Sequence, residues 1–124
     1  IDRGGRYQRE EVGGCSYAPL DRVLPDVLTE EEGHIDYGAN KTAEFAAKGG
    51  ESRERIQNVL NYWYPKALDM FGRSESKRSE RYCYWGIKRR SNRQARAEYT
   101  AEVNPLIEAM GLRVPDPNVG RLYF

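Results

Sequence analysis

The chain of 124 residues has only one histidine and only two cysteines. Cys15 and Cys83 lie far apart and form no CxxC motif, so neither a disulfide framework nor a zinc knuckle is predicted, and both are expected to be small buried residues. No apolar run approaches the length of a membrane span, and no segment has the residue order of a signal peptide. These absences predict a cytoplasmic protein without a membrane partner.

A large excess of charge of one sign is also missing. Twenty basic residues face nineteen acidic ones, which gives a formal net charge of +1. This balance excludes a nucleic-acid binder that works through a large positive field, so any basic site must be local. β-Branched residues are few and period-two runs are absent, whereas apolar residues recur at spacings of three and four. The length and the spacing together predict one all-α domain.

The apolar spacing and the glycine and proline breaks between segments predict helices over 1–14, 20–47, 52–71, 80–90 and 92–110, followed by an extended tail. Pro25 is expected to kink the second helix. The third helix has a strongly apolar face, made of Ile56, Val59, Leu60, Trp63, Ala67, Leu68 and Phe71. We expect this face, with Trp63 and Phe71, to form the core.

The single histidine, His34, lies three positions after Glu31, in a run of three glutamates. If the first two helices form an antiparallel hairpin that turns near Ser16, Asp2 and Glu31 both lie roughly 20 Å from the turn. His34 shares a helical face with Glu31. Two carboxylates and one imidazole at a common point are half of a di-iron carboxylate site, and they suit iron or manganese better than zinc. From spacing alone, a polar histidine on an acidic helix surface is an equal alternative.

Longer stretches of the chain resemble a known family. The segments "GGCSYAPLDRVLPDVLTEEEGHIDYG", "NVLNYWYPKALDMFG", "IKRRSN" and "MGLRVPDPN" are similar to the catalytic A subunits of bacterial ring-1,2-phenylacetyl-CoA epoxidases, which are ferritin-like di-iron monooxygenase components. The most specific parts are the residues from Trp63 to Gly72 and "GLRVPDP". The resemblance implies the C-terminal part of a ferritin-like bundle, with a helical hairpin and core helix over 1–72 and C-terminal helices and tail over 73–124.

The resemblance also implies the ligands of two iron ions. Asp2, Glu31 and His34 match the family's later carboxylate and its second Glu-x-x-His pair, whereas the earlier ligands precede this chain. A basic run falls where the family has a basic segment and would bind the phosphates of coenzyme A; it includes Lys88, Arg89, Arg90 and Asn92. The alternative is a solvated helix end whose basic side chains complement the helix dipole.

The function implied by the resemblance is epoxidation of the aromatic ring of phenylacetyl-CoA in aerobic phenylacetate catabolism. Electrons would come from an NADPH-dependent reductase, and small accessory subunits together with a structural ferritin-like subunit would complete a homo- or hetero-oligomer. Three alternatives stay open: an epoxidase for another acyl-CoA such as benzoyl-CoA, a non-catalytic structural subunit, and a ferritin-like metal-storage protein. Neither nucleic acid nor a membrane is an expected partner.

Overall fold

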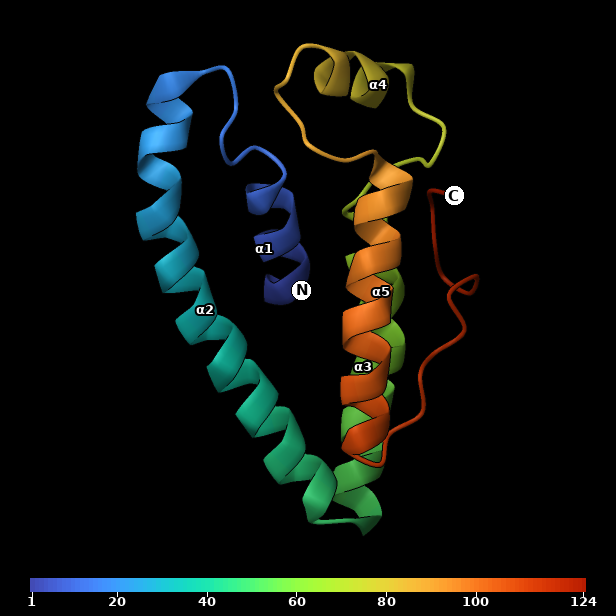
Figure 1. The fold of residues 1–124 in the computed structure, drawn as a ribbon. Helices are drawn as coiled ribbons and strands as arrows, with labels where there is room; N and C mark the ends of the chain where they lie inside the picture. The colour runs from blue at the N-terminus through green and yellow to red at the C-terminus, as the bar shows by residue number, and fades with distance from the viewer.

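Five helices and no strands make up the computed structural model, which describes all 124 residues (Figure 1). They are α1 (Asp2–Glu10), α2 (Ala18–Ala47), α3 (Gly50–Asp69), α4 (Lys77–Tyr84) and α5 (Asn92–Ala109). The predicted all-α class is confirmed, and the arrangement is consistent with a ferritin-like helical bundle. None of the helices combines the length and the apolar character that crossing a membrane requires.

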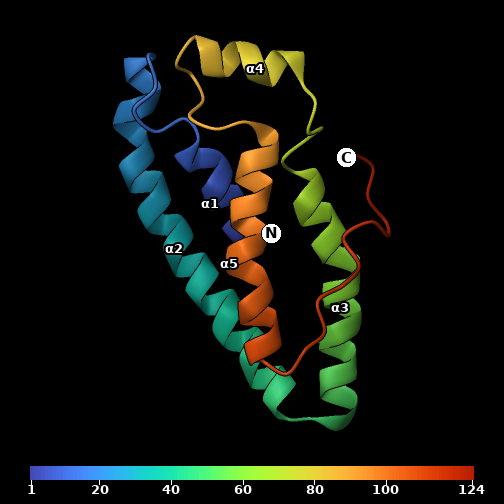
Figure 2. The same cartoon turned by 45° about the vertical axis from the view of Figure 1, so that its right-hand side comes forward.

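The two long helices α2 and α3 run antiparallel and diverge from their short connection at Lys48 and Gly49 (Figure 1). The short helix α1 lies between α2 and α5 and contacts both of them. Helix α5 packs beside α3, and α4 lies across the open end of the molecule (Figure 2). The first hairpin, α1 with α2, therefore forms as the sequence predicted.

Two helices, α1 and α4, differ most from the prediction because of local capping. Helix α1 ends at Glu10, and the turn that follows closes at Gly14, whose φ of 67° suits glycine. Helix α4 begins at Lys77 because the Ser76 side chain accepts the backbone N–H of Ser79 at 3.2 Å. The helix predicted over 1–14 is therefore shorter at its C-terminal end. The helix predicted over 80–90 lies earlier in the chain, at Lys77–Tyr84.

Pro25 lies inside α2 without ending the helix. A proline in this position removes one backbone N–H from the helical ladder. The hydroxyl of Thr29 donates to the carbonyl of Pro25 at 3.0 Å, one turn further on. Figure 1 shows α2 bending along its length rather than breaking.

The core lies between the C-terminal half of α3 and the face of α5 that packs on it. It contains ten buried residues: Tyr7, Ala46, Tyr64, Ala67, Leu68, Phe71, Ala95, Tyr99, Ile107 and Leu112. Phe71 is buried, as predicted, but the prediction for Trp63 was wrong, because its side chain is 47% exposed. The buried stripe of α3 runs through Tyr64, Ala67 and Leu68, and Trp63 lies at its edge. Cys15 and Cys83 are only partly buried, which corrects a second expectation.

The tail after α5 is extended, as predicted, and returns along α3 (Figure 2). The Asp69 carboxylate accepts the backbone N–H groups of Leu122 and Tyr123 at 2.9 and 3.0 Å. The carbonyl of Phe124 accepts the N–H of Ser74 at 2.9 Å. The last residues of the chain are thus fastened to the C-terminal end of α3.

Candidate metal-binding hairpin and apolar hollow

The α1–α2 hairpin buries Glu31, a residue that is 8% exposed. Arg9 of α1 forms an ion pair with one of its oxygens, with Nη1 and Oε1 2.7 Å apart. The other oxygen, Oε2, lies 3.8 Å from Nδ1 of His34, one turn further along α2. The two oxygens of one buried carboxylate therefore have different partners, a guanidinium from α1 and an imidazole from α2.

A glycine lets α1 approach this carboxylate. A Cβ added at Gly5 would lie 2.9 Å from Nη1 of Arg9 and 3.0 Å from Oε1 of Glu31, which is closer than such atoms pack. A Cβ at Gly4 would make only ordinary contacts, the nearest at 3.7 Å to Sδ of Met70. Gly5 is therefore the position where α1 leaves room for the ion pair.

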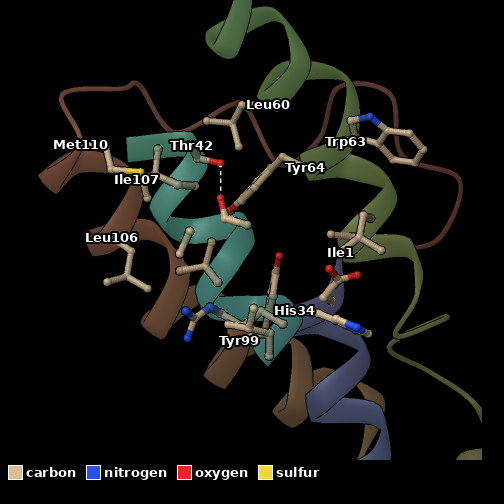
Figure 3. A pocket seen from close by; sticks show the side chains of 17 residues that line it. Ile1, His34, Thr42, Leu60, Trp63, Tyr64, Tyr99, Leu106, Ile107 and Met110 are labelled. Carbon is tan, nitrogen blue, oxygen red and sulfur yellow. Dashed lines mark hydrogen bonds between the residues drawn. The ribbon is translucent and has the colours of Figure 1, made fainter. Parts of the chain in front are cut away.

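Asp2 and His34 line a hollow of about 250 Å³ beside this hairpin (Figure 3). Seventeen residues surround it, and twelve of them are hydrophobic, contributed mainly by α2, α3 and α5. Trp63 lines the same hollow, which explains its exposed side chain. The structure thus brings Glu31 and His34 together and sets Asp2 at the hollow that His34 lines.

These donors suit iron as part of a larger ligand set. A buried carboxylate and an imidazole at i, i+3 are the pair that one helix of a di-iron carboxylate site contributes. No group of three or more His, Cys, Asp or Glu side chains in this chain lies close enough together to hold a metal ion. Glu31 and His34 therefore match one such pair, whereas Asp2 does not join them closely enough to complete a group of three metal ligands.

The predicted coenzyme A residues divide into two groups. Nζ of Lys88 donates to Oδ1 of Asn92 at 2.7 Å, and both residues line a second hollow of about 380 Å³ near α4. Asn92 in turn donates from Nδ2 to the carbonyl of Arg73 at 2.9 Å. Arg89 is exposed and lies over Gly14 instead. Lys88 and Asn92 are therefore the two predicted members that share a hollow.

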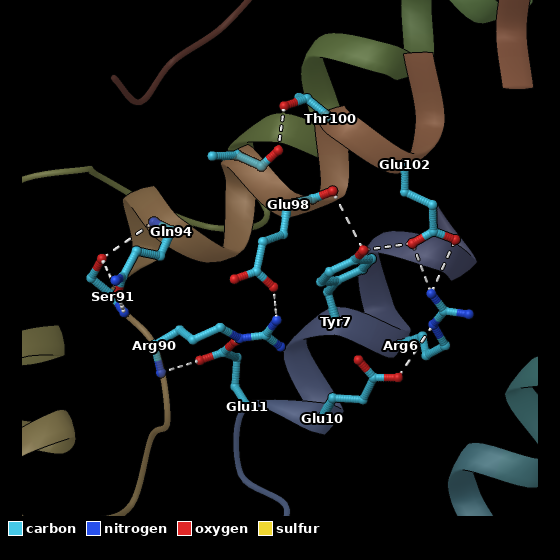
Figure 4. A network of polar contacts seen from close by, with 11 residues as sticks. Arg6, Tyr7, Glu10, Glu11, Arg90, Ser91, Gln94, Glu98, Thr100 and Glu102 are labelled. Carbon is cyan, nitrogen blue, oxygen red and sulfur yellow. Dashed lines mark hydrogen bonds and ion pairs between the residues drawn. The ribbon is translucent and has the colours of Figure 1, made fainter. Parts of the chain in front are cut away.

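Arg90 lies between two carboxylates (Figure 4). Its Nε donates to Oε1 of Glu11 at 2.5 Å, its backbone N–H donates to Oε2 at 2.9 Å, and Nη1 pairs with Glu98. Burial acts to lower the pKa of Arg90, but the charges and hydrogen bonds of Glu11 and Glu98 outweigh it and raise the pKa above its ordinary value. This guanidinium joins Glu11, the residue that follows α1, to Glu98 of α5, and its charge is already balanced.

Comparison with known proteins decides the family. The family described as "Phenylacetic acid catabolic protein" matches residues 3–121. The chain belongs to this family. It is also 32% identical over 107 residues to the A component of the 1,2-phenylacetyl-CoA epoxidase of Escherichia coli (strain K12). That alignment covers 84% of this chain and 34% of the relative, so the chain spans about a third of the relative's length.

In this member of the phenylacetic acid catabolic family, sequence reasoning missed a cluster around Glu102. The Tyr7 hydroxyl donates to Oε2 of Glu102 at 2.5 Å, and Arg6 donates to the same carboxylate at 2.9 Å (Figure 4). Arg3 pairs with this carboxylate as well. Burial and the hydrogen bond to Glu102 raise the pKa of Tyr7 to about 12. The partners are 95 or more positions apart, so no local pattern could have revealed them.

Proposed function

We propose that this chain is part of the oxygenase component of a multicomponent enzyme that epoxidises the aromatic ring of phenylacetyl-CoA. The observation that carries the proposal is the pairing of the buried Glu31 carboxylate with the His34 imidazole, at 3.8 Å, beside an apolar hollow. Family membership and the similarity to the E. coli epoxidase component support the substrate and the reaction.

In this proposal Glu31, His34 and Asp2 are half of the ligands of two iron ions. Oε2 of Glu31 is the oxygen that faces the imidazole, and Arg9 engages Oε1, so the carboxylate is held in one orientation. When bound, the iron ions supply the activated oxygen from which one atom is added to the ring. The hydrophobic walls of the hollow bind the ring.

The coenzyme A end of the substrate is assigned to the second hollow, where Lys88 and Asn92 offer an ammonium and an amide. Phosphate groups bind such donors through charge-assisted hydrogen bonds. Arg89 is an exposed basic side chain next to them, whereas Arg90 stays with Glu11 and Glu98. A structural ferritin-like subunit, an NADPH-dependent reductase and small accessory subunits are the proposed cytoplasmic partners.

One observation favours a second candidate, a non-catalytic structural subunit of the same complex. The ion pair of Arg9 with Glu31 already balances the carboxylate without a metal. In that case the Glu31–His34 pair would hold α1 against α2 and would bind no iron. Epoxidation of another aromatic acyl-CoA, such as benzoyl-CoA, would use the same ligands and the same walls.

The test is the iron content and turnover of the full-length protein assembled with its partner subunits. His34→Ala and Asp2→Ala are expected to lower bound iron and abolish conversion of phenylacetyl-CoA. The control is Glu30→Ala, because Glu30 precedes Glu31 but is exposed and forms no ion pair. Unchanged iron in His34→Ala would contradict the ligand assignment. An iron-free wild-type complex with intact assembly would favour the structural candidate.

A further inference from the structure

The ring of Tyr99 is fixed at the meeting point of α1, α3 and α5. The residue is 3% exposed, and its ring packs against Tyr7 with centroids 5.9 Å apart and planes at 90°. Phe71 lies on another side, with centroids 5.3 Å apart. Gly4 covers a further edge, because a Cβ added there would lie 3.8 Å from Cε2 of Tyr99. The hydroxyl is therefore held in one place by the packing of its ring.

That hydroxyl belongs to the apolar hollow that Asp2 and His34 also line (Figure 3). It has no hydrogen-bond partner in the protein. Tyr64 makes the contrast: it is equally buried and lines the same hollow, but its hydroxyl donates to Oδ1 of Asn104 at 2.8 Å. A hydroxyl that lines the hollow and has no partner within the protein is free to donate to an acceptor bound there.

We propose that the Tyr99 hydroxyl donates a hydrogen bond to the acyl carbonyl oxygen of the bound thioester and so positions the ring within the hollow. This inference rests on the function proposed above and names the atom that the hollow recognises. It makes Tyr99 a specificity-determining residue, because a ligand without that carbonyl leaves the hydroxyl unpaired.

The charges around the hollow favour a neutral carbonyl over the anion of a free acid. Arg3 is the only lysine or arginine among the lining residues, and its guanidinium pairs with Glu102. Asp2 adds a negative charge to the same wall. The side chains of the hollow thus offer a carboxylate ligand no free cation in return for its lost hydration. Burial raises the pKa of Tyr99 to about 12, so the hydroxyl keeps its proton and remains a donor.

The experiment compares two ligands with the assembled full-length enzyme. One is phenylacetyl-CoA, and the other is the thioether 2-phenylethyl-CoA, which keeps the ring and the coenzyme but lacks the carbonyl. Wild type is expected to bind the thioester about two- to tenfold more tightly than the thioether, the range of one net hydrogen bond. Tyr99→Phe is expected to abolish that preference, whereas the matched variant Tyr64→Phe keeps it.

Infrared difference spectra of the thioester labelled with ¹³C at its carbonyl give a readout that packing defects would not mimic. The carbonyl stretch is expected at lower wavenumber in wild type and Tyr64→Phe than in Tyr99→Phe. Two results would overturn the role of Tyr99 and leave the proposed function standing. One is equal binding of the two ligands by wild type, and the other is a carbonyl stretch in Tyr99→Phe at the same wavenumber as in wild type. Failure of wild type to bind either ligand would overturn both.

Discussion

Replacing Gly5 by alanine tests how α1 is seated against Glu31. Alanine in a helix interior is favoured over glycine by about 0.5–1 kcal/mol. Against this gain, the new Cβ would lie 2.9 Å from Nη1 of Arg9 and 3.0 Å from Oε1 of Glu31, so the ion pair has to move. A buried carboxylate that loses its partner costs about 1–3 kcal/mol. The cost here is expected at the lower end, because both atoms end flexible side chains and the Arg9 side chain is 38% exposed to screening solvent.

The neighbouring glycine supplies the matched control. Gly4→Ala places its Cβ no closer than 3.7 Å to any neighbour, so only the gain in helix propensity remains. Urea denaturation followed by circular dichroism should therefore find Gly5→Ala less stable than Gly4→Ala by about 1 kcal/mol. Bound iron should fall in Gly5→Ala alone. Equal stabilities of the two variants would refute the close approach of α1 to Glu31.

Three further outcomes are expected. Leu68→Ala should lower the free energy of unfolding by about 2–5 kcal/mol and Trp63→Ala by much less, because Leu68 is 1% and Trp63 47% exposed; equal losses in urea would contradict this core. Changing Lys88 and Arg89 together to alanine should weaken phenylacetyl-CoA binding and the salt dependence of that binding, without loss of iron. If calorimetry finds the same affinity as in wild type, Lys88 and Arg89 are surface charges that do not bind the ligand. Because the folded protein raises the pKa of Tyr7 from 10 to about 12, the protonated hydroxyl stabilises the fold at neutral pH, and this stabilisation should be lost as the pH rises from 10 toward about 12. Tyr7→Phe should remove the ionisation near pH 12 that belongs to Tyr7 from an absorbance titration.

The hairpin was predictable because helix geometry is regular. Counting from a turn gives the depth of a residue, and a spacing of three gives its face, so the neighbouring positions of Glu31 and His34 followed from the sequence. The same periodicity failed for Trp63, since it defines a stripe but not where the stripe ends. Residues at the edge of an apolar face are buried only if another element covers them, and local spacing carries no information about that element.

The basic run illustrates a different limit. Its composition predicted a phosphate site, but the role of each cation depends on acidic residues elsewhere in the chain. Arg90 meets Glu11, which is 79 positions away, whereas Lys88 meets Asn92 only four positions on. The unpaired hydroxyl of Tyr99 was equally hidden, because nine tyrosines share one residue type and only the fold distinguishes the hydroxyl that lacks a partner.

The separation of α1 from its partners also bears on the order of events during synthesis. Arg3 leaves the ribosome 99 residues ahead of Glu102, and Tyr7 leaves 95 residues ahead of it. At the usual rates of translation this is a delay of about 5–20 s. Helices α2 and α3 are neighbours in sequence and need no such wait to form their hairpin. The buried face of α1 thus spends seconds without its α5 partners on a growing chain, and a ribosome that stalls before α5 leaves Tyr7 exposed to misassociation or to a chaperone.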